Sequence, residues 1–597
     1  MEGLSMRGKA NLTGKLYLRI FFPTLLIQVI NALSSLLDFV IPGQFFGELA
    51  LSAITLTMPL LLLVTAFADM ISLGGSGLFS RELGKGNSKG ARRYFTASML
   101  AALLGGALIT AAGLVFLDPL VRLLGADDAV FAAARRVTAF TLFLFPVMGI
   151  YLSFSYFVRN DGKPSLAMAA DIVFMVSNLL LDILLTGYSS FGVAGSIAAS
   201  IAAAMLSLAV LSAVFFMKQS NLRFSRAPQF SDILAIVRGG YGLTFQSVYE
   251  GIAAGAFNNA IMRALGANGL VLFSVINYVQ EILRSVSFSI RDTVQPMLST
   301  YIGERRPDAM RRVMKLSLKI GTVLSAFMLA VLDLLPPGAY ALFGITLPEL
   351  LAGASMLTRR YAPIAPAVFF TAVYISYYQF LEFPRLSFVM LLIQQLALRL
   401  PAGLLGLKLG GITGLILGLV AAEYLTAALC ILISRLYARR QHPPLSPLLL
   451  LPDGPECCFA GECFATVTDA MELLERFRAF LTNHRIPGRI VNRSALAAEE
   501  LCINVCQHSQ TDNKRIIELY AEVLPEELSV YVRDDSRPFD LITFQEQSPQ
   551  SVGYGLKLVR HSAASVEYIS VLGLNRTVLK FPLTEEHGSS VFHHRME

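Results

Sequence analysis

Residues 170–184 form an apolar stretch with three polar side chains that could bind a cation or a proton, Asp171, Asn178 and Asp182. At about 100° per residue, all three fall within roughly 40° of one face of a helix, along some 16 Å of its length. A carboxylate is costly in hydrocarbon, so such side chains face a cavity or protein partners and often mark the path of an ion or substrate. The alternative is that the two carboxylates lie near the helix ends and reach water.

Carboxylates also occur in other apolar segments of the first 440 residues. Asp38 lies in the first segment, with Asn31 seven residues earlier on the same helix face. Glu250 lies in the seventh segment, with Gln246 one turn before it. All seven histidines lie at or after His442, so carboxylates must carry any proton or cation coupling in this half of the chain.

Burial in a medium of low dielectric constant disfavours the charged form of a carboxylate. An isolated carboxylate can therefore load a proton or Na⁺ on one side of a membrane and release it on the other, as an antiporter requires. Glu281 and Arg284 are three residues apart, and for them we favour a neutralised internal ion pair. The sequence assigns no role to Asp69 or Glu423.

The composition is that of a polytopic membrane protein with room for a soluble domain. Of the 597 residues, 54% are hydrophobic and only 15% are charged, with a mean hydropathy of +0.59; a soluble chain has nearer a quarter charged residues. The net charge of +7 comes from basic residues in short loops, which argues against nucleic-acid binding. Twelve apolar segments have spanning length: 17–41, 52–76, 93–117, 134–157, 165–186, 192–217, 236–262, 268–290, 314–336, 359–381, 386–408 and 412–436.

The loops after the second, fourth, sixth, eighth and twelfth segments are rich in Lys and Arg. By the positive-inside rule, both termini are expected in the cytoplasm, with the chain crossing the inner membrane several times. Arg135 and Arg136 fall on the outer side and argue mildly against this orientation.

The membrane half contains an internal repeat. LGKGNSKGARRY (83–94) resembles IGERRPDAMRRV (302–313), which pairs Gly84 with Gly303 at an offset of 219 residues. The same offset takes Gly125 to Gly344. Two halves of six helices in like orientation, with a cleft between them, form a transporter architecture.

Four motifs in the region of residues ~10–440 resemble the MATE family of multidrug and toxin extrusion transporters. They are LLDFVIPGQFFG (36–47), SRELGKGNSKGARR (80–93), RNDGKPSLAMAADIVFMVSNLLLDILL (159–185) and FGVAGSIAAS (191–200). The resemblance implies twelve helices in two lobes and export of amphipathic, cationic small molecules in exchange for H⁺ or Na⁺. The transporter domain would then cover 1–440, with an N-lobe at ~10–220 and a C-lobe at ~230–440.

The resemblance also implies roles for particular residues. Asp38, Asn178 and Asp182 match the polar cluster of the N-lobe in one branch of the family, and Asp171 lies on the same stripe. Glu250 matches the seventh-helix glutamate that another branch uses in the C-lobe. The tenth segment lacks the aspartate that this second branch has, so we favour the N-lobe cluster.

The composition changes after residues 441–455, a linker with five prolines. Residues 456–584 are expected to form an α+β domain, and the tail at 585–597 is expected to be disordered. The cysteines at 457, 458 and 463 lack zinc-ligand spacing, so ordinary thiols are expected. The expected helices are Thr466–His484, Leu496–Cys506 and Gly555–Ala564, and the expected strands are Arg515–Val523, Leu528–Arg533, Val566–Val571 and Thr577–Phe581.

Three short motifs in this domain suit nucleotide chemistry. EELCINVCQHS (499–509) puts Glu500 and Asn504 on one helix face, where a carboxylate base and an amide oxygen for Mg²⁺ suit phosphoryl transfer. Asp534 ends a strand in VRDDSRPFD (532–540). Gly553 and Gly555 precede a helix, whose free N–H groups suit a phosphate.

In this order and spacing the motifs resemble the GHKL (Bergerat-type) ATPase family, and within it the anti-sigma-factor type of serine kinase. The resemblance implies that Glu500 is the catalytic base, Asn504 the Mg²⁺ ligand and Asp534 the residue that reads the adenine amino group of ATP. It places Gly553 and Gly555 at the nucleotide lid.

Three functions are compatible with this sequence. The first is a cation-coupled exporter of amphipathic small molecules with a cytosolic ATP-binding regulatory domain. The second is a membrane sensor whose GHKL domain phosphorylates a partner similar to anti-sigma-factor antagonists. The third is a lipid flippase. Carboxylates in both halves of the membrane region favour transport over pure sensing.

Overall fold

In the computed structural model, the described residues run from 10 to 583 with gaps. Asp38 lies in a helix whose side chains are outside the described part, and Gly553, Gly125, Gly344 and the tail are outside it altogether. The gaps are 125, 127, 129, 188–190, 192–193, 218–219, 226–227, 337, 339–347, 382, 441–444, 447–448, 452–456, 509–514 and 537–553, and the side chains at 32–55, 243–244, 247, 267 and 554–556 are also undescribed.

The chain divides into two compact units. One unit contains Met1–Leu16 together with Asp453–Glu597, and the other contains Tyr17–Pro452. The second unit is entirely helical in its described residues, whereas the first contains a β-sheet. The first residues of the chain therefore share a unit with the C-terminal domain.

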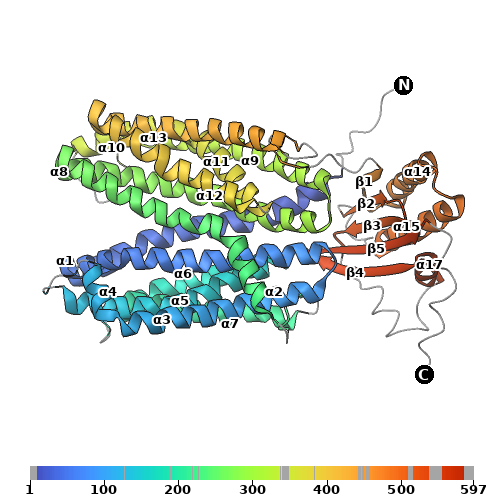
Figure 1. Cartoon of the computed structure of the whole chain (residues 1–597), viewed down its shortest axis with the longest axis horizontal. Coiled ribbons are helices and arrows are strands. Elements are labelled where there is room, and N and C mark those ends of the chain that lie inside the picture. The colour runs from blue at the N-terminus through green and yellow to red at the C-terminus, as the bar shows by residue number, and fades with distance from the viewer. Residues whose placement is uncertain are drawn as a thin grey trace. The chain divides into compact units, whose positions relative to one another are not determined.

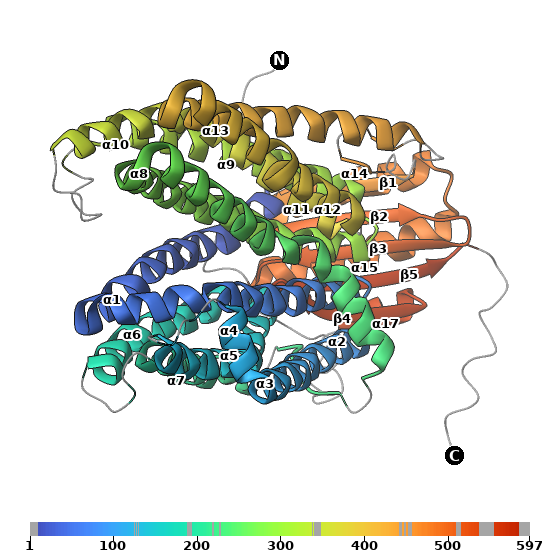
Figure 2. The same ribbon diagram turned by 60° about the vertical axis from the view of Figure 1, so that its left-hand side comes forward.

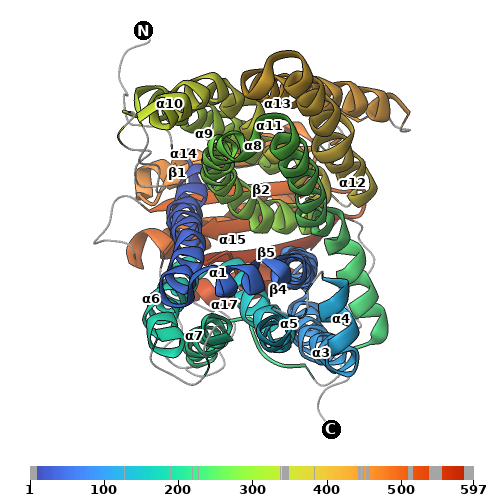
Figure 3. The ribbon, with the colours of Figure 1, turned by 90° about the vertical axis from the view of Figure 1, so that its left-hand side faces the viewer.

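The first half of the membrane unit begins with one very long helix, α1, which runs through the first two apolar segments. Figure 3 shows α3, α5, α6 and α7 gathered in one bundle. The elements are α1 (Leu12–Gly84), α2 (Ser88–Leu100), η1 (Ala101–Gly105), α3 (Gly106–Val115), α4 (Leu117–Leu123), α5 (Phe131–Asn160), α6 (Pro164–Gly187), α7 (Gly195–Ser212) and η3 (Ala213–Phe216).

The second half forms a separate bundle, in which α9 to α13 lie together (Figure 3). Proline begins several of its helices, at the position where a missing N–H costs nothing. The long helix α8 kinks at Gly266, whose φ of 67° is a left-handed conformation that glycine adopts without strain. The elements are α8 (Phe230–Gly303), α9 (Pro307–Leu334), α10 (Pro348–Tyr361), η5 (Ala362–Ile364), α11 (Ala365–Phe380), α12 (Pro384–Leu392), η6 (Ile393–Leu398) and α13 (Arg399–Arg440).

All twelve predicted segments overlap helices, but not every one of them meets the criteria for a membrane-spanning helix. Within the described residues, nine helices are long and apolar enough to cross a membrane, and the longest, Pro384–Arg440, covers two predicted segments. The predicted segments 236–262 and 359–381 are helical but less apolar. A multi-pass helical membrane fold is confirmed, while the count of twelve stays a prediction.

The two halves meet at the repeat motif that the sequence indicates. A Cβ on Gly84 would lie 2.1 Å from the carbonyl oxygen of Thr300, and a Cβ on Gly303 would lie 2.1 Å from that of Arg81. Arg81 and Thr300 are also 219 residues apart. The contact is therefore symmetric between the two repeats, and only glycine allows the two backbones to approach so closely.

The C-terminal unit is an antiparallel sheet of five strands with helices on one face (Figures 1 and 2). Its strand order is β1-β2-β3-β5-β4. The predicted helices and four predicted strands are present, and β1 is an additional strand that the sequence did not reveal. The strands are β1 (Cys458–Phe464), β2 (Ile516–Val523), β3 (Glu527–Asp534), β4 (Ser565–Val571) and β5 (Leu574–Pro582), and the helices are α14 (Val467–Asn483), α15 (Gly488–His508) and α17 (Tyr554–Ser562).

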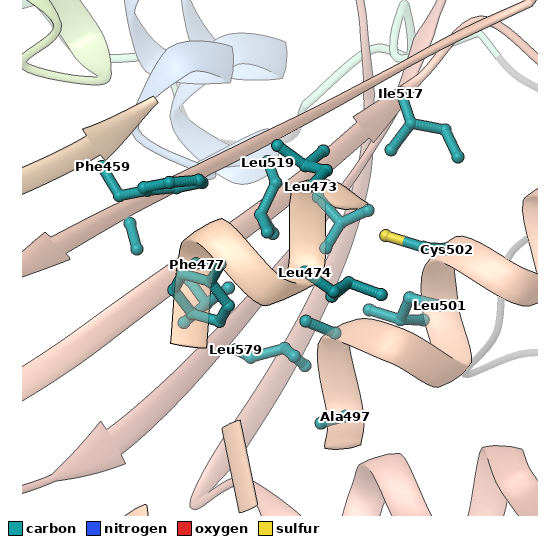
Figure 4. Packing of buried hydrophobic residues seen from close by; sticks show 14 of the residues in the cluster. Phe459, Leu473, Leu474, Phe477, Ala497, Leu501, Cys502, Ile517, Leu519 and Leu579 are labelled. Carbon is teal, nitrogen blue, oxygen red and sulfur yellow. The ribbon is translucent and has the colours of Figure 1, made fainter. Parts of the chain in front are cut away.

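The core of this domain lies between the sheet and its helices. Figure 4 shows Phe459 from the sheet packed near Phe477 of α14, and Cys502 of α15 among leucines. Burial raises the pKa of the Cys463 thiol to about 12 and that of Cys506 to about 11. These cysteines behave as small hydrophobic residues, and no cluster that could hold a metal ion occurs among the described residues.

Part of the proline-rich segment contacts the membrane unit. Tyr377 of α11 donates a hydrogen bond to the carbonyl oxygen of Leu449 at 2.7 Å, and Leu450 and Leu451 are buried. Most other residues of the predicted linker lie outside the described part. At least this portion is therefore packed and does not behave as a free tether.

Candidate functional site

The polar stripe of α6 faces the protein interior at all three of its positions. Asp171, Asn178 and Asp182 are exposed by only 6%, 2% and 1%. These values exclude the alternative in which the carboxylates reach water from the helix ends. The stripe packs between α5 and α7, which supply the partners of Asp171 and Asn178.

Each member of the stripe has a neutral partner. The Tyr151 hydroxyl of α5 donates to Asp171 at 2.5 Å, and Asn178 donates to the Ser200 hydroxyl of α7 at 2.9 Å. Thr186 donates to Oδ1 of Asp182 at 2.7 Å. Oδ2 of Asp182 is buried and accepts no well-formed hydrogen bond from a described residue, and the Ser196 hydroxyl also interacts with this carboxyl group.

A second buried group, which the sequence did not reveal, joins the two lobes. Asp292 of α8 is fully buried and accepts hydrogen bonds from Arg159 of α5 at 3.2 Å and from its neighbour Arg291 at 2.7 Å. Gln28 of α1 donates to the same carboxylate at 2.8 Å, and Tyr156 does so at 3.2 Å. The available signal was the charged pair Arg291–Asp292, which directly follows the apolar segment 268–290.

The C-lobe holds its carboxylates differently. Arg284 donates to both Glu281 and Glu250, and Gln246 donates to Glu250 at 3.0 Å. The ion pair predicted for Glu281 and Arg284 is confirmed, and Glu250 shares the same guanidinium. The carboxylate that the resemblance suggested for the C-lobe therefore already has a cationic partner.

Next to this group lies a small cavity of about 60 Å³, enough for a few water molecules. Glu423 of α13 borders it and accepts hydrogen bonds from Thr371 at 2.5 Å and from Gln394 at 2.7 Å. Arg399 also borders the cavity and donates to Gln280 at 2.5 Å. Glu423 is thus held by neutral donors, although its sequence position suggested no role.

The nucleotide-binding residues predicted from the sequence lie on three neighbouring elements. Asn504 donates to Glu500 at 3.2 Å along one face of α15, which leaves the Asn504 carbonyl oxygen for a metal ion. Helix α15 packs against β3, which ends at Asp534, and against α17, which contains Gly555. The amide-oxygen and carboxylate set fits Mg²⁺ bound with ATP phosphates.

Asp534 is buried and held by neutral donors. It accepts hydrogen bonds from Asn575 of β5 at 2.8 Å and from the backbone N–H of Ser536 at 2.9 Å, and the Ser536 hydroxyl also donates to it. Burial raises the pKa of Asp534, although these hydrogen bonds oppose the shift. Asn575, which Tyr568 orients at 2.7 Å, was not singled out from the sequence.

Comparison with protein families assigns each half separately. Residues 23–184 match the MatE family, and residues 464–581 match the histidine kinase-like ATPase domain family. The first match covers α6 with its polar stripe. The second covers the helix with Glu500 and Asn504 and the strand that ends at Asp534.

Curated relatives match the membrane half. The chain is 22% identical to an FAD transporter of Shewanella oneidensis over 70% of this chain and 93% of that protein. It is 20% identical to the probable multidrug resistance protein YoeA of Bacillus subtilis over 51% of this chain and 68% of that protein.

Solved structures show the same membrane fold. A crystal structure of MATE in complex with MaL6 superposes with a TM-score of 0.67 at 19% identity, over 71% of this chain and 96% of that one. An outward-facing MATE family multidrug resistance transporter superposes with a TM-score of 0.66, over 73% and 98%. The chain therefore joins a MATE-family membrane domain to a C-terminal ATPase domain of the histidine-kinase-like, GHKL type.

Proposed function

We propose that this protein is a cation-coupled exporter of amphipathic small molecules, with a C-terminal domain that binds ATP and regulates transport. The coupling ion is H⁺ or Na⁺, and its site is the N-lobe stripe of Asp171, Asn178 and Asp182, with Asp38 as a further member. Glu250 is not proposed as the principal site, because Arg284 is bound to it. This proposal agrees with the multidrug efflux proteins among the relatives.

The observation that carries the proposal is the state of Asp182. One of its oxygens is buried and accepts no well-formed hydrogen bond from a described residue, and its neighbours are the neutral hydroxyl groups of Thr186 and Ser196. Neither Asp182 nor Asp171 forms an ion pair with a described Lys or Arg. A buried carboxylate in this state favours the binding of a proton or a small cation, because either would remove its uncompensated charge.

Transport in proteoliposomes tests this proposal. The purified chain is reconstituted, loaded with a fluorescent amphipathic cation and exposed to an imposed H⁺ gradient or an imposed Na⁺ gradient. We expect one gradient to drive counter-movement of the dye and the other to have little effect. Dye movement that is the same with either gradient, or with none, would contradict cation coupling.

The ATP-binding role rests on the arrangement around α15. Asn504 would hold Mg²⁺ through its free carbonyl oxygen, Asp534 would accept a hydrogen bond from the adenine amino group, and Glu500 would orient the attacking group. The helix start at Gly555 would contact the phosphates, together with Gly553. Intact protein and the Asn504→Ala variant are compared in the transport assay with ATP and Mg²⁺. We expect ATP to change the wild-type rate and to leave the variant rate unchanged.

The proposed topology is an inner-membrane protein with both termini in the cytoplasm. The compact unit that residues 10–16 share with the C-terminal domain supports a location of the two on the same side of the membrane. This requires an even number of spans, as in the proposed twelve. Protease protection of tags at each end in sealed inner-membrane vesicles tests it.

A serine kinase is the second candidate function. The contact between Glu500 and Asn504 supports it, because a base and a metal ligand one helical turn apart suit phosphoryl transfer. Labelled ATP is incubated with the intact chain and candidate antagonist-like partners, with Glu500→Gln as the control. Transfer that requires Glu500 would favour this function over simple regulation.

A further inference from the structure

The first turn of α1 is built into the ATPase domain. Asn11 begins the helix, because its side chain accepts a hydrogen bond from Gly14 N at 2.7 Å. The backbone N–H of Leu12 donates to the Glu462 carboxylate of β1 at 2.7 Å, although the two residues are 450 positions apart. A carboxylate at this position stabilises the helix start by satisfying a free N–H and by favouring the positive end of the helix dipole.

A second contact ties the same turn to the nucleotide site. The Lys15 ammonium lies 2.5 Å from the carboxylate of Asp535, whose side chain is only 8% exposed. Asp535 also accepts a hydrogen bond from Ile516 N at 2.8 Å, which fixes it at the end of the sheet. It directly follows Asp534, the residue proposed to read adenine. A displacement of Asp534 would therefore also displace Asp535, the residue that Lys15 contacts.

Helix α1 continues from this turn into the membrane unit. Gln28 lies 13 residues after Lys15 in the same helix, which is about 20 Å along its axis. Its side chain donates to Asp292 at 2.8 Å, in the buried group that joins the two lobes. One continuous helix thus has a polar contact with the ATPase domain near its start and a polar contact with the lobe interface further along.

We propose that Lys15 and the first turn of α1 transmit nucleotide occupancy of the ATPase domain to the membrane lobes. This inference rests on the proposed regulatory function and identifies the element that carries it. The helix backbone is stiff along its axis, so a shift of Asp535 displaces Lys15 and, through α1, the Gln28–Asp292 contact. The coupling is reciprocal, because binding at one site changes the affinity at the other by the same factor.

Transport by the full chain tests the transmission step. Wild type, Lys15→Gln and Lys15→Arg are reconstituted, and the ratio of rates with and without ATP and Mg²⁺ is measured. In wild type, we expect ATP to change the transport rate by about five-fold, which is at the lower end of typical coupling between sites. The ratio should fall to about one in Lys15→Gln and recover in Lys15→Arg, which keeps the charge. Lys89→Gln, an exposed lysine at the start of α2, is the matched control.

A fluorescence measurement reports on the helix itself. The chain contains no tryptophan, so Leu18→Trp places a single reporter at an exposed position one turn after Lys15. We expect ATP with Mg²⁺ to change its emission, and the change to disappear when Lys15→Gln is added. Binding of a fluorescent ATP analogue is measured in parallel and should be unchanged, within about two-fold.

The outcomes separate this inference from the proposed function. An equal ATP response in wild type and Lys15→Gln would overturn transmission through Lys15 and leave regulation by ATP intact. Loss of analogue binding in Lys15→Gln would also overturn it, because Lys15 would then act at the nucleotide site. An emission change without any transport response would support the linkage and contradict the regulatory function.

Discussion

The two lobes contain buried carboxylates in similar helices but compensate them differently. In the N-lobe, Asp171 and Asp182 are held by hydroxyl groups, and one oxygen of Asp182 accepts no well-formed hydrogen bond from a described residue. In the C-lobe, Glu250 and Glu281 share the guanidinium of Arg284. Position within a membrane segment therefore does not identify a coupling carboxylate. We propose that the partner does, because a carboxylate paired with an arginine has less need of a mobile cation than one held only by hydroxyl groups.

Asp182→Asn should give the largest change. The amide keeps the shape of the side chain but carries no charge and cannot take up a proton, so coupled transport should fall by about ten-fold, equivalent to about 1.4 kcal/mol. Gradient-driven dye transport in proteoliposomes measures the loss. Asp118→Asn is the control, because that carboxylate forms an exposed ion pair with Arg135. Wild-type coupling in Asp182→Asn would remove the contrast between the lobes.

Arg284→Gln should produce the next largest effect, on stability. It leaves Glu250 and Glu281 side by side without their cation. Because Arg284 is 29% exposed, we expect the free energy of unfolding to fall by about 1–2 kcal/mol. This is below the loss of about 3–5 kcal/mol that is typical when a fully buried pair is broken. Thermal unfolding of the detergent-solubilised protein measures it. Glu250→Gln should cost less, since Glu281 still balances Arg284; equal costs would show that the three charges do not act as one group.

Tyr151→Phe sharpens the comparison within the N-lobe. It removes the hydroxyl that donates to Asp171 and leaves the carboxylate buried, which should cost about 1–3 kcal/mol of stability. The double variant Tyr151→Phe with Asp171→Leu should recover part of this loss, because no polar group remains unpaired. Thermal unfolding of all three variants tests this, and a double variant less stable than Tyr151→Phe would contradict it.

Asp534 in the ATPase domain is also a buried carboxylate held by neutral donors. Its substitution should have the smallest effect of the four, and that effect is on ATP affinity. Burial raises its pKa in the folded domain, so folding favours the protonated form and this contribution to stability is lost as the pH rises through the folded pKa. ATP needs the ionised form to accept the adenine amino hydrogen. ATP affinity should therefore weaken from neutral to mildly acidic pH. Asp534→Asn should bind ATP more weakly and lose this pH dependence, as titrations with a fluorescent analogue would show.

Local sequence patterns predicted the elements well but not their partners. The stripe on α6 followed from residue spacing alone, and its burial agrees with that spacing. The Asp292 group could not be predicted, because Arg159 and Gln28 reach it from helices far apart in the sequence. Contacts of this kind depend on how the helices pack, which one sequence does not reveal.

The ATPase domain shows the same limit. Strands β2 to β5 were predicted from the sequence, whereas β1, with its two cysteines and a glycine, was not. The motifs predicted Glu500, Asn504 and Asp534, but not Asn575, which lies 41 residues after the carboxylate that it contacts. Strand pairing between β3 and β5 brings the two together.

The symmetric contact between Gly84 and Gly303 has a consequence for the history of this fold. Equivalent positions of two copies that touch across a symmetry axis form the type of interface found in a two-fold homodimer. In a dimer of two identical halves, the same glycine would supply both sides of this contact. In this chain, a larger side chain at either glycine would collide with a main-chain carbonyl oxygen of the other repeat. Each repeat therefore restricts which residue the other can have at this position.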